Sequence, residues 1–260
     1  MMNSVNTVGS MTGAMRLANS GKSSTGGDRV EVYLEGSIGP AWADMIDAAT
    51  IRAELDKHDA VDEIDLRINS GGGSIIEGLG IYNYFSQHRA KVNVYIDGLA
   101  GSTAGWIAMA GDEISIAENA FVMLHDPHSF AGGNAAELRR EADTLDRMKD
   151  SIAKTFAKRT NIEESEIADM MTAETWLRGG QAVGKGFADK VIEAKGYAVN
   201  CDLGGFNRVP DYVRGLIEHR SSDTSADREN SERKADKSEV QQAKPSVDAR
   251  LDELNAIAMR

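Results

Sequence analysis

Alternating hydrophobic and polar positions predict three strands in the first half of the chain. Successive side chains of a strand point to opposite faces, so the hydrophobic set would share one buried face. Val30, Val32 and Leu34 show this pattern most strictly. The three predicted strands span residues 29–35, 63–68 and 92–96.

Apolar residues at helical spacing fill the intervals between these strands. Pro40 can begin a helix without losing a hydrogen bond, because the first N–H of a helix has no internal partner. We expect this helix to run to His58, with these apolar residues along one side: Trp42, Met45, Ile46, Ala49 and Leu55. A second helix should follow Ser74, with apolar residues over most of its circumference.

The third strand leads into a glycine-rich reversal. Gly98 and Gly101 allow a sharp change of direction, and an apolar helix must then begin near Thr103. Two short strands are predicted at residues 113–116 and 121–124, and a last strand at residues 188–192.

A long helix is predicted from Asn134 to about Arg159. Asn134 and Glu137 have the spacing of a capping box. The apolar residues recur every three or four positions and form one stripe, which would pack either on the same domain or on the same helix of another subunit. The stripe consists of Leu138, Leu145, Met148, Ile152 and Phe156.

Two shorter helices are predicted after this one. Asn161 and Glu164 repeat the capping spacing for a helix that ends near Met171, and another helix should begin at about Gly180. The repeated alternation of strand and helix predicts an α/β fold with a largely parallel sheet of right-handed βαβ units. Each of two glycine-rich turns follows a strand, and open α/β sheets place their sites at such strand ends.

Composition divides the chain into a folded domain and polar ends. Residues 1–28 are rich in Gly, Ser, Thr and Asn and are expected to form a flexible arm. The folded domain should span residues 29–200, followed by a C-terminal extension at residues 201–219. Residues 220–260 form a polar tail that should be disordered, with a short amphipathic helix near its end that would contact another chain.

Charge and cysteine content narrow the class of protein. The formal net charge of −12 argues against nucleic acid as the main partner. The single cysteine, Cys201, excludes an internal disulfide and a thiolate metal site, so we expect no metal and a reducing compartment. Without an apolar run that could span a bilayer or act as a secretory signal, the sequence predicts a cytoplasmic protein without membrane contact.

Ser102 stands where the third strand meets the apolar helix. The first turn of a helix offers unpaired N–H groups and a positive dipole end, so a nucleophile there has stabilisation for an oxyanion close by. The alternative is a serine that only caps the helix. The spacing differs from the G-x-S-x-G elbow of the α/β-hydrolases.

The segment Asn69 to Ser74 contains three consecutive glycines between a strand and a helix. Such glycines bring the backbone close to another group. A phosphate loop is one alternative, although the G-x-x-x-x-G-K-[ST] spacing is absent, and a plain tight turn is another.

His125 directly follows a predicted strand, and Asp126-Pro127 favours an extended exit from it. A histidine in this position is a candidate catalytic base, or simply a polar residue near the surface. The other histidines have weaker claims: His58, His88, His128 and His219.

Four motifs together resemble the Clp peptidase family (ClpP), the self-compartmentalised serine proteases. They are INSGGGS, GLAGSTAGWIAMAG, MLHDP and ETWLRGGQAVGKGFADKV, in the family's order and with compatible spacing. The resemblance covers residues 30–194. The long helix and the residues around Trp176 most resemble the ClpP-like proteases encoded in phage and prophage head-morphogenesis regions.

The resemblance implies a role for each matched residue. It implies that Ser102 is the nucleophile and His125 its base. The backbone N–H groups of Gly72 and Thr103 match the oxyanion hole, and Gly73 and Ser74 belong to the loop that binds substrate.

The third catalytic residue departs from the family pattern. Glu174 occupies the position of the family's aspartate, and Asp169 and Asp126 are the other candidates. Gly71 stands where the family usually has proline, which should loosen the substrate-binding loop.

The resemblance also implies an architecture and partners. It implies the ClpP/crotonase-like superfold of repeated β-β-α and βαβ turns, with a long protruding handle helix at residues 134–159. It implies heptameric rings that stack as a tetradecamer through these helices, no cofactor, and an AAA+ unfoldase as an optional partner. The substrate would be an unfolded polypeptide or a capsid or scaffold protein, and the enzyme would act as an endopeptidase, which hydrolyses internal peptide bonds.

Three other functions are compatible with parts of this pattern. A crotonase-type enzyme uses the same superfold to bind acyl-CoA and to stabilise an enolate. A serine protease with a Ser–Lys dyad would not need His125. A catalytically silent ring would act as an assembly scaffold through its acidic tail.

Overall fold

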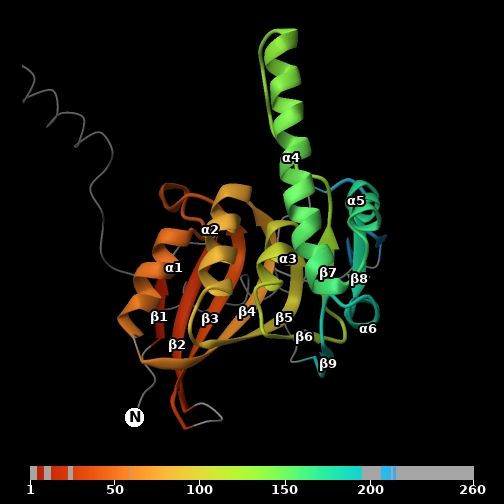
Figure 1. Cartoon of the computed structure of the whole chain (residues 1–260). Coiled ribbons are helices and arrows are strands. Elements are labelled where there is room, and N and C mark those ends of the chain that lie inside the picture. Colours follow the sequence, from red (N-terminus) through yellow and green to blue (C-terminus); the bar gives the residue numbers. More distant parts are fainter. Residues whose placement is uncertain are drawn as a thin grey trace, which may run out of the picture. The chain divides into compact units, whose positions relative to one another are not determined.

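The computed structural model describes residues 5–8, 13–22, 26–58, 60–194, 206–211 and 213–214. The predicted polar tail with its terminal helix, His219 and Cys201 lie outside the described residues. In the described residues the predicted α/β architecture is present, and Figure 1 shows its elements.

One mixed sheet of nine strands runs through the described part of the chain, in the order β1-β2-β3-β4-β5-β6-β9, with β7 paired to β5 and β8. The pairings from β3 through β4, β5 and β6 to β9 are all parallel, as the sequence predicted. The strands are β1 (Val5–Val8), β2 (Gly13–Lys22), β3 (Asp28–Ile38), β4 (Val61–Gly73), β5 (Lys91–Gly101), β6 (Glu113–Ala117), β7 (Phe121–Leu124), β8 (Thr175–Arg178) and β9 (Lys190–Ile192).

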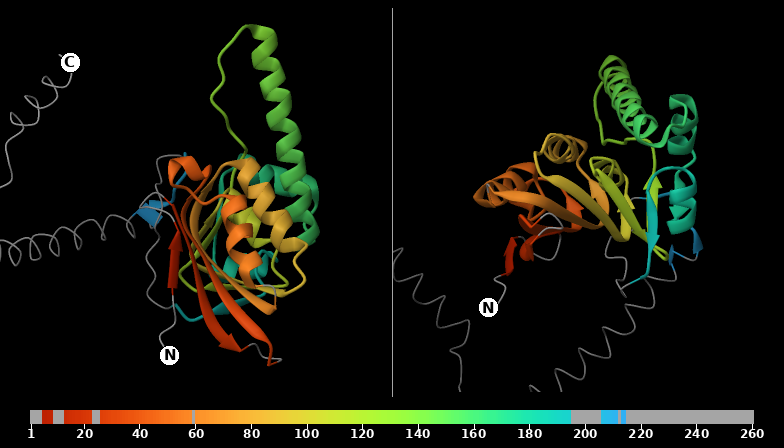
Figure 2. Two further views of the ribbon diagram at one scale, coloured as in Figure 1. Left: turned by 90° about the vertical axis from the view of Figure 1, so that its left-hand side faces the viewer. Right: turned by 60° about the horizontal axis from the view of Figure 1, so that its bottom comes forward.

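Helices α1, α2 and α3 lie over one face of the sheet (Figure 2). Their buried residues, such as Ile51, Ile81 and Ile107, meet the strand residues Val32, Ile64 and Val94 in one hydrophobic core. The helices are α1 (Ala48–Leu55), α2 (Ile75–Ser86), α3 (Thr103–Ala108), α4 (Ala135–Thr160), α5 (Glu164–Thr172) and α6 (Gly179–Gly184), with short 3-10 helices at Ala41–Ala43 and Asp56–His58. No described helix has the length and hydrophobicity needed to cross a membrane.

The N-terminal segment differs from the prediction of an arm without regular structure. β1 pairs with β2, and β2 pairs antiparallel with β3. Met15 and Leu17 of β2 are buried in the core, and the guanidinium of Arg16 lies 3.8 Å from the centre of the Tyr33 ring. β2 completes the hydrogen bonding of β3 on the side away from β4, a long-range pairing that local composition did not indicate.

The helix predicted from Pro40 to His58 is also wrong in its first half. A 3-10 turn ends at Asp44, which has a positive φ of 54°. α1 begins only after Asp47, whose side chain accepts a hydrogen bond from the Thr50 N–H (2.9 Å). As a result Trp42, expected on the buried side, is 88% exposed.

The capping box at Asn134 and Glu137 is confirmed, but the one at Asn161 is not. Asn161 has a positive φ of 59° and ends α4 instead of beginning α5. The N-cap of α5 is Glu163, whose side chain makes no cap hydrogen bond. Asparagine suits both positions, because it caps helix starts and also tolerates the left-handed conformation at helix ends.

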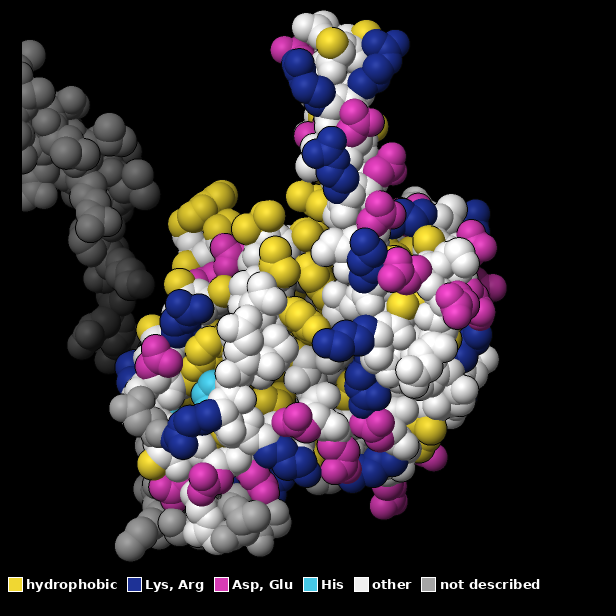
Figure 3. All heavy atoms as spheres, viewed as in Figure 1, with side chains coloured by type: hydrophobic (Ala, Val, Ile, Leu, Met, Phe, Trp, Pro, Cys, Tyr) yellow, Lys and Arg dark blue, Asp and Glu magenta, His cyan; other side chains and the backbone are white. Residues whose placement is uncertain are grey.

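The long helix α4 projects from the sheet with its N-terminal half, which carries side chains of both charges and few hydrophobic ones (Figures 1 and 3). Only Ala153, Phe156 and Thr160 of this helix are buried. The C-terminal part of the apolar stripe therefore packs on its own domain, whereas Leu138 near the other end is 44% exposed.

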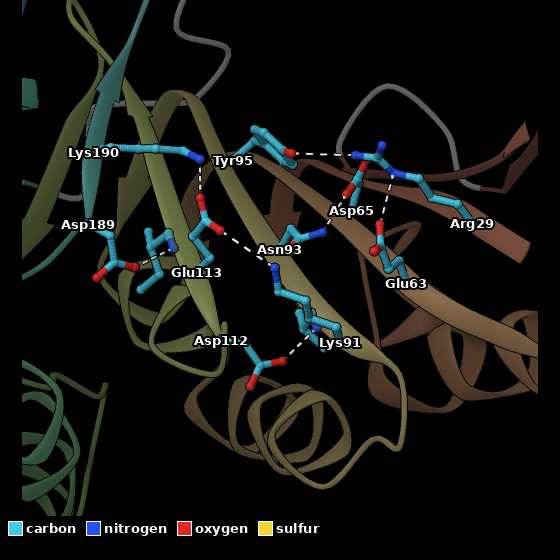
Figure 4. A network of polar contacts seen from close by, with 12 residues as sticks. Arg29, Glu63, Asp65, Lys91, Asn93, Tyr95, Asp112, Glu113, Asp189 and Lys190 are labelled. Carbon is cyan, nitrogen blue, oxygen red and sulfur yellow. Dashed lines mark hydrogen bonds and ion pairs between the residues drawn. The ribbon is translucent and has the colours of Figure 1, made fainter. Parts of the chain in front are cut away.

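A polar network joins the amino ends of the parallel strands (Figure 4). Asp112 accepts a hydrogen bond from the Val92 N–H (2.8 Å), and Asp189 accepts one from the Ile114 N–H (2.7 Å). Ion pairs connect Arg29 with Asp65 and Lys190 with Glu113. These carboxylates stabilise the amino ends of the strands. The glycine-rich turns lie at the opposite, carboxyl ends of β4 and β5.

Candidate active site

Ser102 lies between the last residue of β5 and the first residue of α3. Its backbone has a φ of 52° and a ψ of −122°, a conformation that a residue with a side chain rarely adopts. Its N–H donates to the carbonyl oxygen of Met123 (2.8 Å), which holds the turn in place. The Ser102 hydroxyl makes no cap hydrogen bond, so capping α3 is not its role.

His125 lies immediately after β7, which pairs in parallel with the end of β5. In that pairing Gly101 is opposite Met123, so the residues just beyond both strands come together. The Nε2 atom of His125 lies 2.8 Å from the Oγ atom of Ser102. The sheet thus joins two residues 23 positions apart in a serine–imidazole hydrogen bond.

The surroundings of His125 keep its imidazole neutral. Burial lowers the pKa of His125 below its ordinary value, and the nearby His128 lowers it further. The negative charges of Glu174 and Asp126 act in the opposite direction without reversing the shift. At neutral pH this ring is therefore free to accept a proton.

The glycine loop lies against the backbone of Ser102. A Cβ atom on Gly72, where φ is 92°, would stand 2.6 Å from the Gly101 carbonyl oxygen and 2.8 Å from the Thr103 nitrogen. The Thr103 hydroxyl donates to the Gly73 carbonyl oxygen (2.9 Å) and fixes the two segments to each other. Gly72 therefore needs to be glycine both for its backbone conformation and for this close approach.

The polar groups of this loop are engaged within the protein. The Gly72 N–H donates to the Ser70 hydroxyl (3.0 Å). The Ser74 hydroxyl accepts from the Glu77 N–H (3.3 Å) and so caps α2. An oxyanion role for Gly72 would require its N–H to turn from Ser70 to the bound substrate.

Replacing Gly72 by alanine is expected to slow the reaction of the Ser102 hydroxyl with a serine-reactive probe by about 100-fold, because a small displacement of reacting groups has effects of this size. The new Cβ would push the glycine loop away from Ser102 and would strain a positive φ. The rate of labelling by a serine-reactive probe measures the effect. Gly132→Ala is the matched control, since nothing lies within 4 Å of its added Cβ. Equal rates in both variants would contradict the close approach.

Glu174 precedes β8 and has a buried side chain and a positive φ of 52°. Its Oε2 accepts a hydrogen bond from the Asn207 N–H (2.7 Å), and its Oε1 accepts one from the Arg208 N–H (2.7 Å). The indole N–H of Trp176 also donates to Oε1 (3.4 Å). Among the described residues, these donors hold the carboxylate, and its effect on His125 is through charge.

The two other candidate acids are placed differently. Asp126 forms an ion pair with Lys149 (2.9 Å) and accepts a hydrogen bond from the Thr172 hydroxyl (3.4 Å). Asp169 lies on the exposed side of α5. Because Glu174 is buried and acts on His125 while Asp169 is exposed, the geometry favours Glu174 over Asp169 as the orienting carboxylate.

A cavity of about 470 Å³ opens beside Ser102 and His125. The glycine loop forms one of its walls, and α4 supplies an apolar wall that the sequence analysis did not foresee. Phe206, also missed, completes the lining from beyond the predicted domain. The apolar part of the lining includes Trp106, Leu145, Met148, Ile152, Phe156 and Phe206.

Within the described residues, no group of three or more His, Cys, Asp or Glu side chains is arranged to hold a metal ion. The polar groups close to Ser102 Oγ include the His125 imidazole and the backbone of the glycine loop.

The family model and the similar proteins described below are all Clp proteases. The family model described as Clp protease matches residues 29–195. The chain is 32% identical over 164 residues to the ATP-dependent Clp protease proteolytic subunit 3, chloroplastic, of Arabidopsis thaliana; the match covers 62% of this chain and 52% of that protein. The chain thus spans about half the length of this relative.

Two cyanobacterial proteins are similar over a shorter stretch of this chain. The ATP-dependent Clp protease proteolytic subunit 1 of Synechococcus sp. (strain CC9902) is 30% identical over 143 residues, which cover 54% of this chain and 73% of that protein. The proteolytic subunit 2 of Parasynechococcus marenigrum (strain WH8102) is 29% identical over 143 residues, with the same shares.

Proposed function

The chain belongs to the Clp protease family, and we propose that it is a serine endopeptidase that cleaves peptide bonds through an acyl-enzyme on Ser102. The observation that carries the proposal is the 2.8 Å contact between the Ser102 hydroxyl and His125 Nε2. A serine hydroxyl is a weak nucleophile unless an adjacent base takes its proton. The same contact favours proteolysis over acyl-CoA chemistry and over a Ser–Lys dyad.

In the proposed reaction, a residue of the site serves each step. Ser102 Oγ attacks the carbonyl carbon of the peptide while its proton passes to His125 Nε2. The oxyanion accepts hydrogen bonds from the N–H groups of Thr103 and Gly72, the latter released from Ser70. The tetrahedral intermediate expels the amine, which takes the proton from His125, and water then hydrolyses the acyl-enzyme by the same route.

The cavity supports binding of an extended peptide next to the glycine loop. Main-chain hydrogen bonds would hold such a peptide with little demand on its sequence. The apolar lining from Trp106, Leu145 and Met148 favours an apolar side chain next to the cleaved bond.

Labelling with a fluorophosphonate probe, followed by peptide mass spectrometry, tests the proposal directly. The expected result is one adduct on Ser102 and none on any other serine. A protein that assembles but never reacts with such probes would instead support the scaffold alternative.

We further propose a ring-shaped oligomer of heptameric type, in which the exposed part of α4 contacts another ring. The relatives are named proteolytic subunits of an ATP-dependent protease, which supports assembly with further subunits and leaves an AAA+ unfoldase as a candidate partner. The motif resemblance supports a role in phage head maturation, with capsid or scaffold proteins as substrates and the bacterial cytoplasm as the location. Mass photometry of the purified protein measures the ring size.

The identity of the orienting acid leads to a separate prediction. Glu174→Gln should lower the acylation rate by about 10² to 10⁴-fold, because the neutral amide no longer stabilises the charged imidazole. Asp169→Asn, on the exposed side of α5, is the matched control and should change the rate by less than about 3-fold. Probe labelling rates at pH 7 measure both variants. A large loss in Asp126→Asn with none in Glu174→Gln would assign the role to Asp126.

A further inference from the structure

Residues 206–211 and 213–214 lie beyond the stretch that matches the family model, yet this segment contacts the candidate active site. The ring of Phe206 packs edge-on against His125, with centroids 5.7 Å apart, and against Trp176, with centroids 5.6 Å apart. Phe206 also lines the cavity beside Ser102. This segment is therefore in direct contact with the candidate base.

The segment is anchored to the sheet by its own hydrophobic residues. Val209 and Val213 are buried against Leu99, Phe121 and Met123 of β5 and β7. The guanidinium of Arg208 donates to the Ala173 carbonyl oxygen (3.1 Å), next to Glu174. These contacts hold the backbone at residues 207 and 208 in a defined place.

The segment also supplies most of the hydrogen bonds of the Glu174 carboxylate. Glu174 is 8% exposed, and a buried carboxylate is costly unless donors replace the lost water. Of its three donors in the described residues, the N–H groups of Asn207 and Arg208 are the two shorter ones, at 2.7 Å each. The third, from Trp176, is longer at 3.4 Å.

We propose that residues 206–211 and 213–214 are a positioning element of the active site: the N–H groups of Asn207 and Arg208 hold the Glu174 carboxylate in place for His125, and Phe206 fixes the imidazole ring. The inference rests on the proposed peptidase function and extends the catalytic unit beyond the family domain. Asn207 and Arg208 act through Glu174 and are positioning residues.

The proposal predicts the direction in which the pKa of His125 should change. Among the described residues, the charged or titratable groups that act on this ring are His128, Asp126 with its ion partner Lys149, and Glu174. Burial and His128 lower the pKa of His125, and the negative charges of Glu174 and Asp126 raise it. If the Glu174 carboxylate loses its anchors and moves away, the pKa of His125 should fall, and the acidic limb of the rate profile should move to lower pH.

The test compares two substitutions of Asn207, by proline and by alanine, in the full-length protein. Asn207→Pro removes the N–H donor, whereas Asn207→Ala keeps it and removes only the side chain. We expect fluorophosphonate labelling of the proline variant to be about 10-fold slower than of the alanine variant, because a hydrogen bond to a charged group contributes about the free energy of a tenfold change in rate. The acidic limb of the pH–rate profile should also lie at lower pH in the proline variant than in the alanine variant. The pair Arg208→Pro and Arg208→Ala repeats the comparison at the second donor if thermal melting shows that Asn207→Pro is unfolded.

A second readout separates this proposal from the proposed function. Carbon-13 labelling of histidine lets NMR follow the His125 pKa without any reaction, with the signal assigned by its loss in His125→Gln. A lower His125 pKa in the proline variant than in the alanine variant supports the positioning role even if Ser102 never reacts. Equal pKa values and equal labelling rates in folded proline and alanine variants would overturn it, whether or not the protein is a peptidase.

Discussion

Ser102→Ala is expected to lower the rates of peptide hydrolysis and of fluorophosphonate labelling at least about 10³-fold. In the proposed mechanism the hydroxyl attacks the peptide carbonyl, and His125 Nε2, which lies 2.8 Å from it, takes its proton. Removing the nucleophile leaves only the weak catalysis that binding and oxyanion stabilisation can supply. Rates of peptide hydrolysis and the mass of the probe-treated protein give the two measurements.

Ser129→Ala is the control for this variant, because Ser129 lines the same cavity and instead donates to the Glu141 carboxylate (2.7 Å). It should retain full labelling. Ser102→Gly adds a second check, since glycine relieves the positive φ at this position and should be about 1 kcal/mol more stable than Ser102→Ala while equally inactive. Undiminished labelling of Ser102→Ala would refute the assignment of the nucleophile.

His125→Ala is expected to lower the acylation rate by at least about 10³-fold. Without the imidazole, the proton of Ser102 has no acceptor among the described side chains that it contacts. Because burial lowers the pKa of His125, the wild-type rate should rise through an acidic limb below the ordinary histidine value and should be level at pH 7. Labelling rates measured from pH 4 to pH 9 check the loss and the profile together.

His128→Ala provides a directional control for the histidine prediction. His128 lowers the pKa of His125, so its removal should move the acidic limb to higher pH with little change in the plateau rate. Full activity of His125→Ala would contradict the triad and would support a Ser–Lys dyad instead.

The local patterns of the sequence predicted much of the fold because they depend on near neighbours. Alternation in β3 and β5, the capping box at Asn134 and the glycine-rich turns each express a preference of a few adjacent residues. Where two conformations suit one residue type, as at Asn161, the same reasoning failed. It also failed at Trp42, where the left-handed Asp44 and the Asp47 cap end one turn and begin another.

The sequence by itself determined which chemical groups are available: a serine at a strand-to-helix turn, a histidine after a strand, and a glycine loop without the spacing of a phosphate site. Only the tertiary structure decided that they meet, because the register of β7 on β5 brings Ser102 to His125 and the edge of β3 orders β2. The two donors to Glu174 and the ring of Phe206 also come from outside any local pattern. The physical reason is that periodicity and capping act within a few residues, whereas strand pairing and the packing of Val209 and Val213 depend on surfaces that exist only once the sheet has formed.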